Sequence, residues 1–287
     1  MKKTRELKPA DLPSKTIAVS VQTDVGCVRE ANEDNARHVS PNDAEMQLRK
    51  GTLTIVADGM GGHASGEIAS QMAIELISEI YYASDNGSGK ADAAEALRNA
   101  IEAASREIYE TSLTDEKYFG MGTTLVALVV FDDRAIAAHV GDSRIYRLRG
   151  QELEMLTLDH SQVMEMVKHG VISMEEARSH DDKNVILRAV GTQPQVEVEV
   201  SEPFAVQAGD AFLLCSDGLS DMLSDAEIRE TWLAAEADIY AAAEQLINEA
   251  KKRGGHDNIT VGIVKISFPD DAKASRRRAR VTREVEV

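Results

Sequence analysis

The sequence predicts an α+β fold in which antiparallel strands and helices occupy separate stretches of the chain. Strand-like segments follow one another directly in two hairpins between residues 122 and 156. Helix-like segments come in adjacent pairs, at 64–112 and 224–252, and do not alternate with strands one by one. A regular strand–helix alternation would favour a doubly wound parallel sheet, so this order favours antiparallel sheet with segregated helices.

Short apolar or alternating runs mark the expected strands. Residues 16–23 alternate, whereas 53–57 and 211–214 are mainly apolar without polar alternation and are typical of strands buried on both faces. A tight turn at Asp132–Asp133 joins 122–131 to 134–140, and a second turn around Gly150 joins 143–148 to 153–156. The remaining strands are expected at 194–200 and 259–268.

Helices are expected where apolar residues recur with helical spacing. Residues 64–82 carry such a stripe at Ile68, Met72 and Leu76, and the alanine-rich segment 91–112 continues the pattern. A third helix begins in 159–170. The helices at 224–234 and 238–252 open with Ser224 and Asp238, which are residue types that cap helix N-termini.

The polar segments are interpreted as connections. By composition, 24–35 is a solvated loop, 36–50 is a polar connection and 171–186 is a charged insertion. We expect a flexible arm at 1–15, one domain at 16–268 and a disordered, arginine-rich tail at 269–287.

Composition narrows the classes of function. The chain has 287 residues, which is enough for one large domain with a substantial core. Its formal charge of -17 argues against nucleic acid or an anionic membrane as a general partner, because phosphate groups attract positive charge. A phosphorylated substrate at a local metal site stays compatible with this charge, because bound cations invert the local field.

The cysteines and the apolar content point to a reduced, cytoplasmic setting. Cys27 and Cys215 have no spacing typical of a zinc site or a disulfide framework. Cys215 lies in an apolar strand and is interpreted as a small core residue. The charged N-terminus is not a secretory signal, and no apolar run is long enough to span a membrane.

Acidic residues recur at the ends of apolar strands. Asp58, Asp142 and Asp217 each follow such a run, and Asp257 stands just before one. In an antiparallel sheet, the end of one strand and the start of its neighbour lie at the same edge, so these four acids can gather at one rim. An Asp-Gly pair after a strand is also a common hairpin turn. However, Asp58 and Asp217 are followed by helices rather than by returning strands.

Gathered carboxylates suggest a site for divalent metal ions. Oxygen ligands suit Mg²⁺ or Mn²⁺ better than zinc, and two such ions can activate a water for displacement at phosphorus. A guanidinium would grip the phosphate oxygens, and Arg29, four residues before Glu33, is the natural candidate.

Six ordered sequence blocks then resemble a known family. They are REANEDN at 29–35, VADGMGGH at 56–63, GMGTT at 120–124, AHVGDSR at 138–144, CSDG at 215–218 and GHDNIT at 255–260. Together they resemble the bacterial form of the metal-dependent protein phosphatases called PPM or type 2C. The resemblance covers about residues 16–268.

The resemblance implies a sandwich of two antiparallel sheets flanked by helices on both sides, an αββα arrangement. It implies hydrolysis of phosphoserine and phosphothreonine in proteins by a metal-activated water, without a phosphoenzyme intermediate. It also implies phosphoprotein partners, a bacterial Ser/Thr kinase among them, and we expect a monomer. The segment at about 158–189 corresponds to the family's variable flap beside the site.

The same resemblance assigns roles to particular residues. It implies two tightly bound Mn²⁺ or Mg²⁺ ions and a weaker third, with Arg29 binding the substrate phosphate. The implied metal ligands, either direct or through water, are Glu33, Asp34, Asp58, the carbonyl of Gly59, Asp142, Asp217 and Asp257.

One position departs from the animal members, which carry a histidine directly after the bridging Asp-Gly. Here that residue is Met60, and His63 is offset by three positions, so the general acid is left unassigned. His139, in mid-strand, is interpreted as a satisfied core histidine, and His160 and His169 as solvated residues near the flap.

Two rival functions are left open by the residues. One is a metal phosphohydrolase that acts on small molecules or nucleotides, and the other is a catalytically silent phosphoprotein binder. The second predicts missing metal acids, which are all present. Cysteine-based phosphatase chemistry is set aside because neither cysteine opens a helix in a basic setting.

Overall fold

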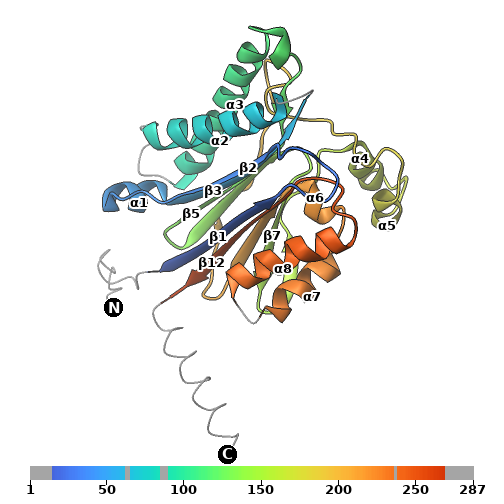
Figure 1. Cartoon of the computed structure of the whole chain (residues 1–287). Coiled ribbons are helices and arrows are strands. Elements are labelled where there is room, and N and C mark those ends of the chain that lie inside the picture. The colour runs from blue at the N-terminus through green and yellow to red at the C-terminus, as the bar shows by residue number, and fades with distance from the viewer. Residues whose placement is uncertain (1–14, 62–64, 85–89, 236–237, 269–287) are drawn as a thin grey trace, which may run out of the picture.

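Two antiparallel sheets pack face to face, and helices cover both outer faces (Figure 1). The structure is a computed structural model that describes residues 15–61, 65–84, 90–235 and 238–268. One sheet has five strands in the order β1-β12-β11-β7-β8. The other has seven strands. Five follow the path β10-β6-β5-β3-β2, while β4 pairs with β3 and β9 pairs with β6. This confirms the αββα arrangement that the resemblance implies.

Long strands form the centre of each sheet, and two-residue strands extend the larger one. Their bounds are β1 Thr16–Asp24, β2 Asp34–Val39, β3 Thr52–Met60, β4 Gly122–Thr123, β5 Leu125–Phe131, β6 Arg134–Val140, β7 Arg144–Arg149, β8 Glu152–Met155, β9 Glu199–Val200, β10 Phe204–Ala205, β11 Ala211–Cys215 and β12 Ile259–Ser267.

The long helices form the outer layers, and the short ones lie near strand ends. The bounds are α1 Ala44–Lys50, α2 Ser65–Ala83, α3 Lys90–Ser112, α4 Gln162–Lys168, α5 Met174–Arg178, α6 Asp217–Ser220, α7 Asp225–Ala234 and α8 Ile239–Lys252, with a 3₁₀ turn at Glu116–Tyr118. Figure 1 shows α2 and α3 over the seven-stranded sheet and α7 and α8 over the five-stranded sheet.

Three apolar cores correspond to the three interfaces between the four layers. One joins α2 and α3 to the seven-stranded sheet, with Ile77 and Leu97 fully buried. A second joins α7 and α8 to the five-stranded sheet. The third lies between the sheets, where Phe212 faces Val126 and Leu128. Because each layer buries apolar surface against its neighbour, removing water from these surfaces stabilises the whole stack.

Two of the segments expected to be irregular are ordered. The region 36–50 is not a plain connection, because it holds most of β2 and all of α1. β2 pairs only with β3, at the end of the sheet path, so its partly buried polar residues conceal the strand pattern. α1 is capped by Asp43, whose side chain accepts the backbone N–H of Met46 at 2.7 Å. The prediction of a solvated loop at 24–35 is also wrong at the end of that segment, where Asp34 begins β2 and is 5% exposed.

The flap and the segment after it differ from the sequence-based expectation in three ways. The helix expected from 159 begins at Gln162, because Ser161 is the N-cap and accepts the backbone N–H of Met164. The charged insertion 171–186 contains α5, which starts with a capping box between Ser173 and Glu176. The strand expected at 194–200 shrinks to β9, which covers only Glu199–Val200.

The predicted arm and tail lie almost wholly outside the described residues. Residues 1–14 and 269–287 are not part of the description, so the expected domain limits at 16 and 268 stay predictions.

Replacing Phe212 with alanine should test the inter-sheet core. Phe212 is fully buried between the sheets, so Phe212→Ala should lower the free energy of unfolding by about 3–5 kcal/mol. Phe119→Ala is the matched control, because Phe119 is 77% exposed, and its effect should stay within about 0.5 kcal/mol. Urea unfolding measures both variants. Equal effects would contradict the assignment of this core.

Candidate active site

The candidate site lies at one rim of the sandwich, where strands of both sheets end or begin. β3 and β6 of the seven-stranded sheet end there and β2 begins there. β11 of the five-stranded sheet ends at the same rim, and β7 and β12 begin there. The four acids singled out in the sequence are all placed at this rim, and each of the other three acts electrostatically on Asp58.

Asp34 and Asp58 sit opposite each other on β2 and β3. Asp58 and Gly59 lie within β3 rather than after it, because the strand continues to Met60 and pairs with β4. The backbone carbonyl of Asp58 accepts the N–H of Thr124 at 2.8 Å and the hydroxyl of Thr123 at 2.8 Å. The strand is therefore held firmly at the point where it presents its carboxylate.

The five-stranded sheet and its loops supply the other acids. Asp217 is the first residue of α6, directly after β11, and Asp257 lies in the loop that leads into β12. Asp142 stands in the turn between β6 and β7. The centre therefore draws its carboxylates from both sheets.

Burial and mutual repulsion raise the carboxyl pKa values of four acids in this cluster, Asp34, Asp58, Asp142 and Asp217. Burial raises the pKa of Asp58 well above its ordinary value, and repulsion from Asp34 and Asp217 adds to the shift. Asp217 is shifted in the same direction by burial and by Asp142. Burial raises the pKa of Asp34 to about 6 against the opposing hydrogen bond from Ser216. Burial and then Asp159 raise the pKa of Asp142 to about 7.

The donor set fits a hard divalent cation. Oδ1 of Asp34 and Oδ1 of Asp217 are buried and accept no hydrogen bond from the described protein. Buried carboxylate oxygens without a partner are costly, and a bound cation would satisfy them and reverse the repulsion. Oxygen ligands of this kind suit Mg²⁺ and Mn²⁺.

Glu33 and Gly59 meet at the start of α2. The N–H of Gly59 donates to the carbonyl of Glu33 at 3.2 Å. A Cβ atom on Gly59 would lie 2.1 Å from the carbonyl oxygen of Gly66, so only glycine lets β3 approach the helix this closely. The Glu33 carboxylate packs over Gly66, which places it beside the cluster.

Arg29 reaches the cluster from the loop between β1 and β2. Its Nη2 donates to Oδ2 of Asp257 at 2.7 Å, while 53% of the side chain stays exposed. The structure therefore puts the predicted phosphate ligand against a predicted metal ligand. A guanidinium this exposed can form a two-pronged contact with an incoming phosphate.

Sequence reasoning did not single out the side chains that hold these loops. Asn258 donates to the carbonyls of Val25 and Ala31 at 3.0 and 2.9 Å and accepts the N–H of Glu33 at 2.8 Å. Ser216 donates to Oδ2 of Asp34 at 2.7 Å, which joins the two sheets. Their only sequence signal is adjacency to Asp257 and Asp217.

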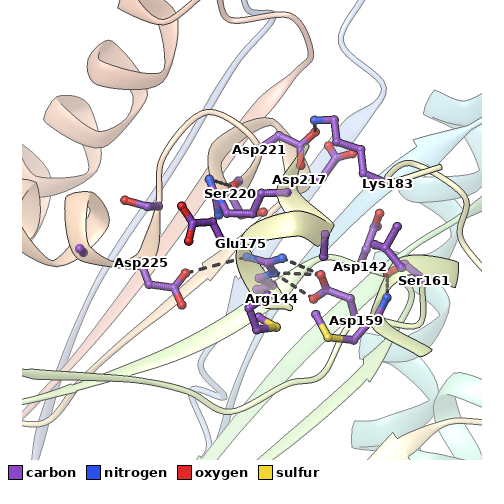
Figure 2. A pocket seen from close by; sticks show the side chains of 17 residues that line it. Asp142, Arg144, Asp159, Ser161, Glu175, Lys183, Asp217, Ser220, Asp221 and Asp225 are labelled. Carbon is purple, nitrogen blue, oxygen red and sulfur yellow. Dashed lines mark hydrogen bonds and ion pairs between the residues drawn. The ribbon is translucent and has the colours of Figure 1, made fainter. Parts of the chain in front are cut away.

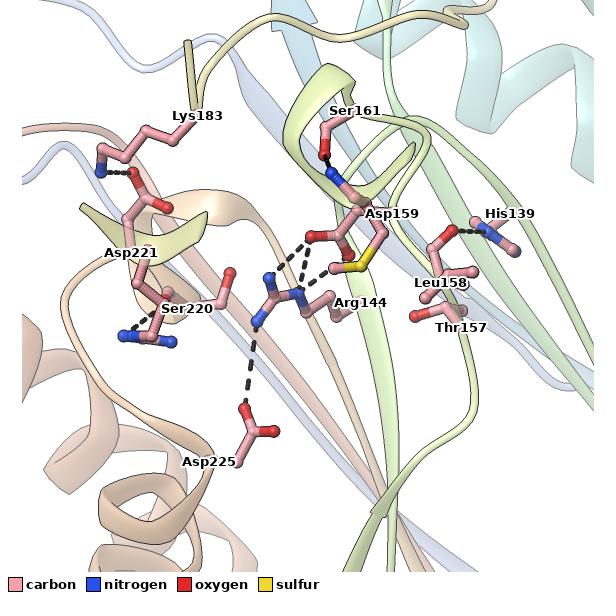
Figure 3. Close-up of polar contacts among 12 residues, drawn as sticks. His139, Arg144, Thr157, Leu158, Asp159, Ser161, Lys183, Ser220, Asp221 and Asp225 are labelled. Atoms are coloured by element: carbon pink, nitrogen blue, oxygen red, sulfur yellow. Dashed lines mark hydrogen bonds and ion pairs between the residues drawn. The ribbon is translucent and has the colours of Figure 1, made fainter. Parts of the chain in front are cut away.

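Arg144 is committed to a carboxylate of its own. Nε of Arg144 donates to Oδ1 of Asp159 at 2.9 Å and Nη2 donates to Oδ2 at 2.6 Å (Figure 3). Both side chains are largely buried, so this two-pronged pair fixes the start of the flap against β7. Arg144 therefore does not compete with Arg29 for a phosphate.

The histidines near the flap differ from expectation in one case. Nε2 of His139 donates to the Leu158 carbonyl at 2.8 Å, in agreement with a satisfied core histidine (Figure 3). His160 is not solvated, because it is 8% exposed and stacks on His139 with ring centroids 4.4 Å apart. Its Nδ1 accepts the N–H of Gly141 at 3.2 Å, which supports the turn that carries Asp142.

His139, His160 and Glu199 also place possible ligand atoms within 4.8 Å of one another. A hydrogen-bonded cluster explains them better than a metal. Because Nδ1 of His160 accepts a hydrogen bond, its proton lies on Nε2, which faces Oε2 of Glu199 at 3.3 Å. The Arg188 guanidinium stands 3.2 Å from the same nitrogen and would repel a cation.

Other predicted residues fall outside the site or outside the description. Cys215 is fully buried, and burial raises the pKa of its thiol to about 12, as expected for an inert core residue. Met60 pairs with Gly122 at the end of β3. His63 lies outside the described residues, and the general acid stays unassigned.

An αββα sandwich with clustered carboxylates and an exposed arginine at one rim is the arrangement of a metal-dependent phosphohydrolase. Comparison with known proteins identifies the family. The family description "Protein phosphatase 2C" matches residues 31–251, so the chain belongs to the protein phosphatase 2C family.

Named relatives agree with this family assignment. The chain is 39% identical over 244 residues to the serine/threonine phosphatase stp of Listeria monocytogenes, covering 85% of this chain and 93% of stp. A solved serine/threonine phosphatase of S. agalactiae superposes with a TM-score of 0.78 at 38% identity, covering 87% of this chain and 99% of that one.

A third relative carries metal. It is the catalytic domain of the serine/threonine protein phosphatase PstP in complex with two manganese ions, with a TM-score of 0.71 at 33% identity, covering 88% of this chain and 100% of that one. The chain is therefore a serine/threonine protein phosphatase of a metal-dependent family. Among the described helices, none has the length and apolar character needed to cross a membrane.

The metal-free protein should lose stability as pH rises. The folded pKa values of Asp34 and Asp142, about 6 and about 7, exceed the ordinary value of 3.8, so the folded state binds more protons than the unfolded state between these limits. Stability should therefore fall between about pH 4 and about pH 7. Thermal unfolding with a chelator measures this slope.

Added Mn²⁺ should remove the slope by pairing the carboxylates with positive charge, and Asp142→Asn should reduce it without metal. A metal-free melting temperature that rises steadily over this pH range would contradict the repulsive cluster.

Proposed function

We propose that the chain hydrolyses phosphoserine and phosphothreonine in proteins through the carboxylate cluster at the rim, without a phosphoenzyme intermediate. The observation that supports this proposal most directly is that buried carboxylates without a hydrogen-bond partner come together from both sheets beside Arg29. When bound, two Mn²⁺ or Mg²⁺ ions would supply an activated water and offset charge that develops on the phosphoryl group. The described residues would hold those ions and orient the phosphate.

The proposed roles follow the positions of the acids. Asp58 and the carbonyl of Gly59 would hold the ions, together with Asp217 and Asp257. Glu33 and Asp34 would hold coordinated waters. Support comes from Oδ1 of Asp34 and of Asp217, which are buried and accept no hydrogen bond from the described residues, and from the repulsion that neighbouring carboxylates exert on Asp58. Asp142, at the flap side of the cluster, would serve a weaker third ion.

Arg29 is proposed to bind the phosphate. Its ion pair with Asp257 is partly exposed and therefore weak, so it can be exchanged for a pair with the phosphate dianion. The fork of N–H groups would fix the phosphorus in line with the attacking oxygen.

The proposed partners are phosphoproteins, including a Ser/Thr kinase of the same cell. The names of the matched relatives support phosphoprotein substrates. Deleting this phosphatase in cells with and without that kinase tests the partnership. Phosphoprotein levels that rise equally in both strains would contradict it. The monomeric state and cytoplasmic location stay predictions.

Asp217→Asn should abolish metal-dependent phosphate release. The variant removes one negative charge from the metal shell, so the rate with Mn²⁺ on a phosphothreonine peptide should fall a hundredfold or more, about 3 kcal/mol. The matched control is Asp221→Asn, one helical turn further on, which keeps all of the proposed ligands. Wild-type release that continues in excess chelator would contradict a metal mechanism.

Arg29→Ala should weaken phosphate binding while metal binding is kept. Loss of a charge-assisted contact of about 1.5–3 kcal/mol predicts a decrease in kcat/KM of roughly 10- to 150-fold, mainly through KM. Arg29→Lys should recover part of it, because lysine keeps the charge and loses the fork. Calorimetric titration with Mn²⁺ provides the control. An unchanged KM would exclude Arg29 as the phosphate ligand.

A further inference from the structure

A cavity of about 310 Å³ opens beside the carboxylate cluster (Figure 2). The flap helices α4 and α5 form one wall, and α6 with the start of α7 forms the other. Asp142 and Asp217 line its inner end, so the cavity leads directly to the proposed reaction centre. Its volume falls at the lower end of the range for ligand pockets.

The flap is tied down at its base, which keeps this cavity formed. The N–H of Gln162 donates to the carbonyl of Val185 at 2.9 Å, and the N–H of Leu187 donates to the carbonyl of His160 at 2.7 Å. On the far side of the cavity, Arg178 donates to the carbonyl of Ser220 at 3.2 Å. The first two bonds therefore join the two ends of the flap to each other, and the third attaches α5 to α6.

The cations that line the cavity are already engaged. Arg144 forms its two-pronged pair with Asp159, and Lys183 pairs with Asp221 (Figure 3). Arg178 is held by the carbonyl of Ser220. Among the described lining cations, only Arg178 has no carboxylate partner, and carboxylates outnumber cations in the lining.

Two carboxylates of the lining lack a close cation. Glu175, in the first turn of α5, forms no ion pair within the described part of the chain. Asp225, the first residue of α7, accepts the Tyr146 hydroxyl at 3.0 Å, but Nη1 of Arg144 lies 3.9 Å away. Since Arg144 is satisfied by Asp159, Asp225 keeps most of its negative charge.

Part of the lining is apolar. Val163, Met164 and Ala177 are buried and contribute carbon surface from the flap helices. An apolar wall below exposed carboxylates suits a long basic side chain, which packs its methylene stem on carbon and keeps its charged end in water. An acidic or a short polar side chain would match neither feature.

We propose that this cavity is a substrate subsite for an arginine or lysine that flanks the phosphorylated residue. The proposal rests on the proposed phosphatase function, because the phosphate must occupy the adjacent centre. The basic side chain would enter between α5 and α7 and place its charge near Glu175 and Asp225. The overall charge of -17 also favours the approach of basic substrates, but it favours every basic position alike.

A peptide scan separates a defined subsite from this general attraction. Phosphothreonine peptides with an alanine background carry a single arginine, moved through each flanking position, and a parallel set carries glutamate. We expect arginine to raise kcat/KM by about two- to fivefold at one position or two neighbouring ones. The same gain at every position would reflect only the charge of the whole protein and would overturn the subsite.

Variants assign the preference to the cavity. Glu175→Gln should remove most of the arginine preference, Asp225→Asn should reduce it, and Glu175→Arg should shift the preferred residue to glutamate at the same position. Glu230→Gln is the matched control, because Glu230 is exposed on α7 and does not line the cavity. An arginine preference that survives in both Glu175 variants would overturn the proposal.

A small substrate makes failure of the subsite distinguishable from failure of the function. p-Nitrophenyl phosphate does not reach between α5 and α7, so the wild type and Glu175→Gln should hydrolyse it equally with Mn²⁺. Equal hydrolysis together with no positional preference would overturn the subsite alone. No release by the wild type from this compound or any peptide would overturn the proposed function and the subsite with it.

Discussion

Burial of mutually repelling carboxylates at the shared rim of the two sheets is the constraint on which this structure depends. Asp34, Asp58, Asp142 and Asp217 all have raised pKa values, and burial is the largest cause for each. Such a cluster is unfavourable in a metal-free protein at neutral pH, so the surrounding scaffold must hold it in place. The apolar cores between the four layers stabilise this scaffold and so offset the cost of the carboxylate cluster.

Close backbone approach transmits this support to the acids. Gly59 lets β3 touch the start of α2, and Gly218 plays the same part for α6, where a Cβ would lie 2.0 Å from the carbonyl of Asn258. Ser216 then bonds across the sheets to Asp34. The charges are therefore positioned by backbone packing and by short polar side chains, not by long flexible ones.

Sequence predicted the long elements and the gathering of the acids, because apolar periodicity and antiparallel geometry are local rules. It failed where tertiary contacts decide the structure. β2 has a polar composition because it borders only β3, and the burial of Asp34 and His160 depends on partners far along the chain. The hydrogen bonds of Asn258 join residues more than two hundred positions apart, and no local sequence pattern encodes such a contact.

The division of the centre between the two sheets has a consequence for how the protein is made. Asp58 is synthesised long before Asp257 and β12, and β12 lies between β1 and β11. A ribosome-bound chain that lacks this last strand has neither a complete five-stranded sheet nor a complete set of acids. The proposed catalytic site is therefore complete only after β12 has been made, and a translation product interrupted before β12 would lack it.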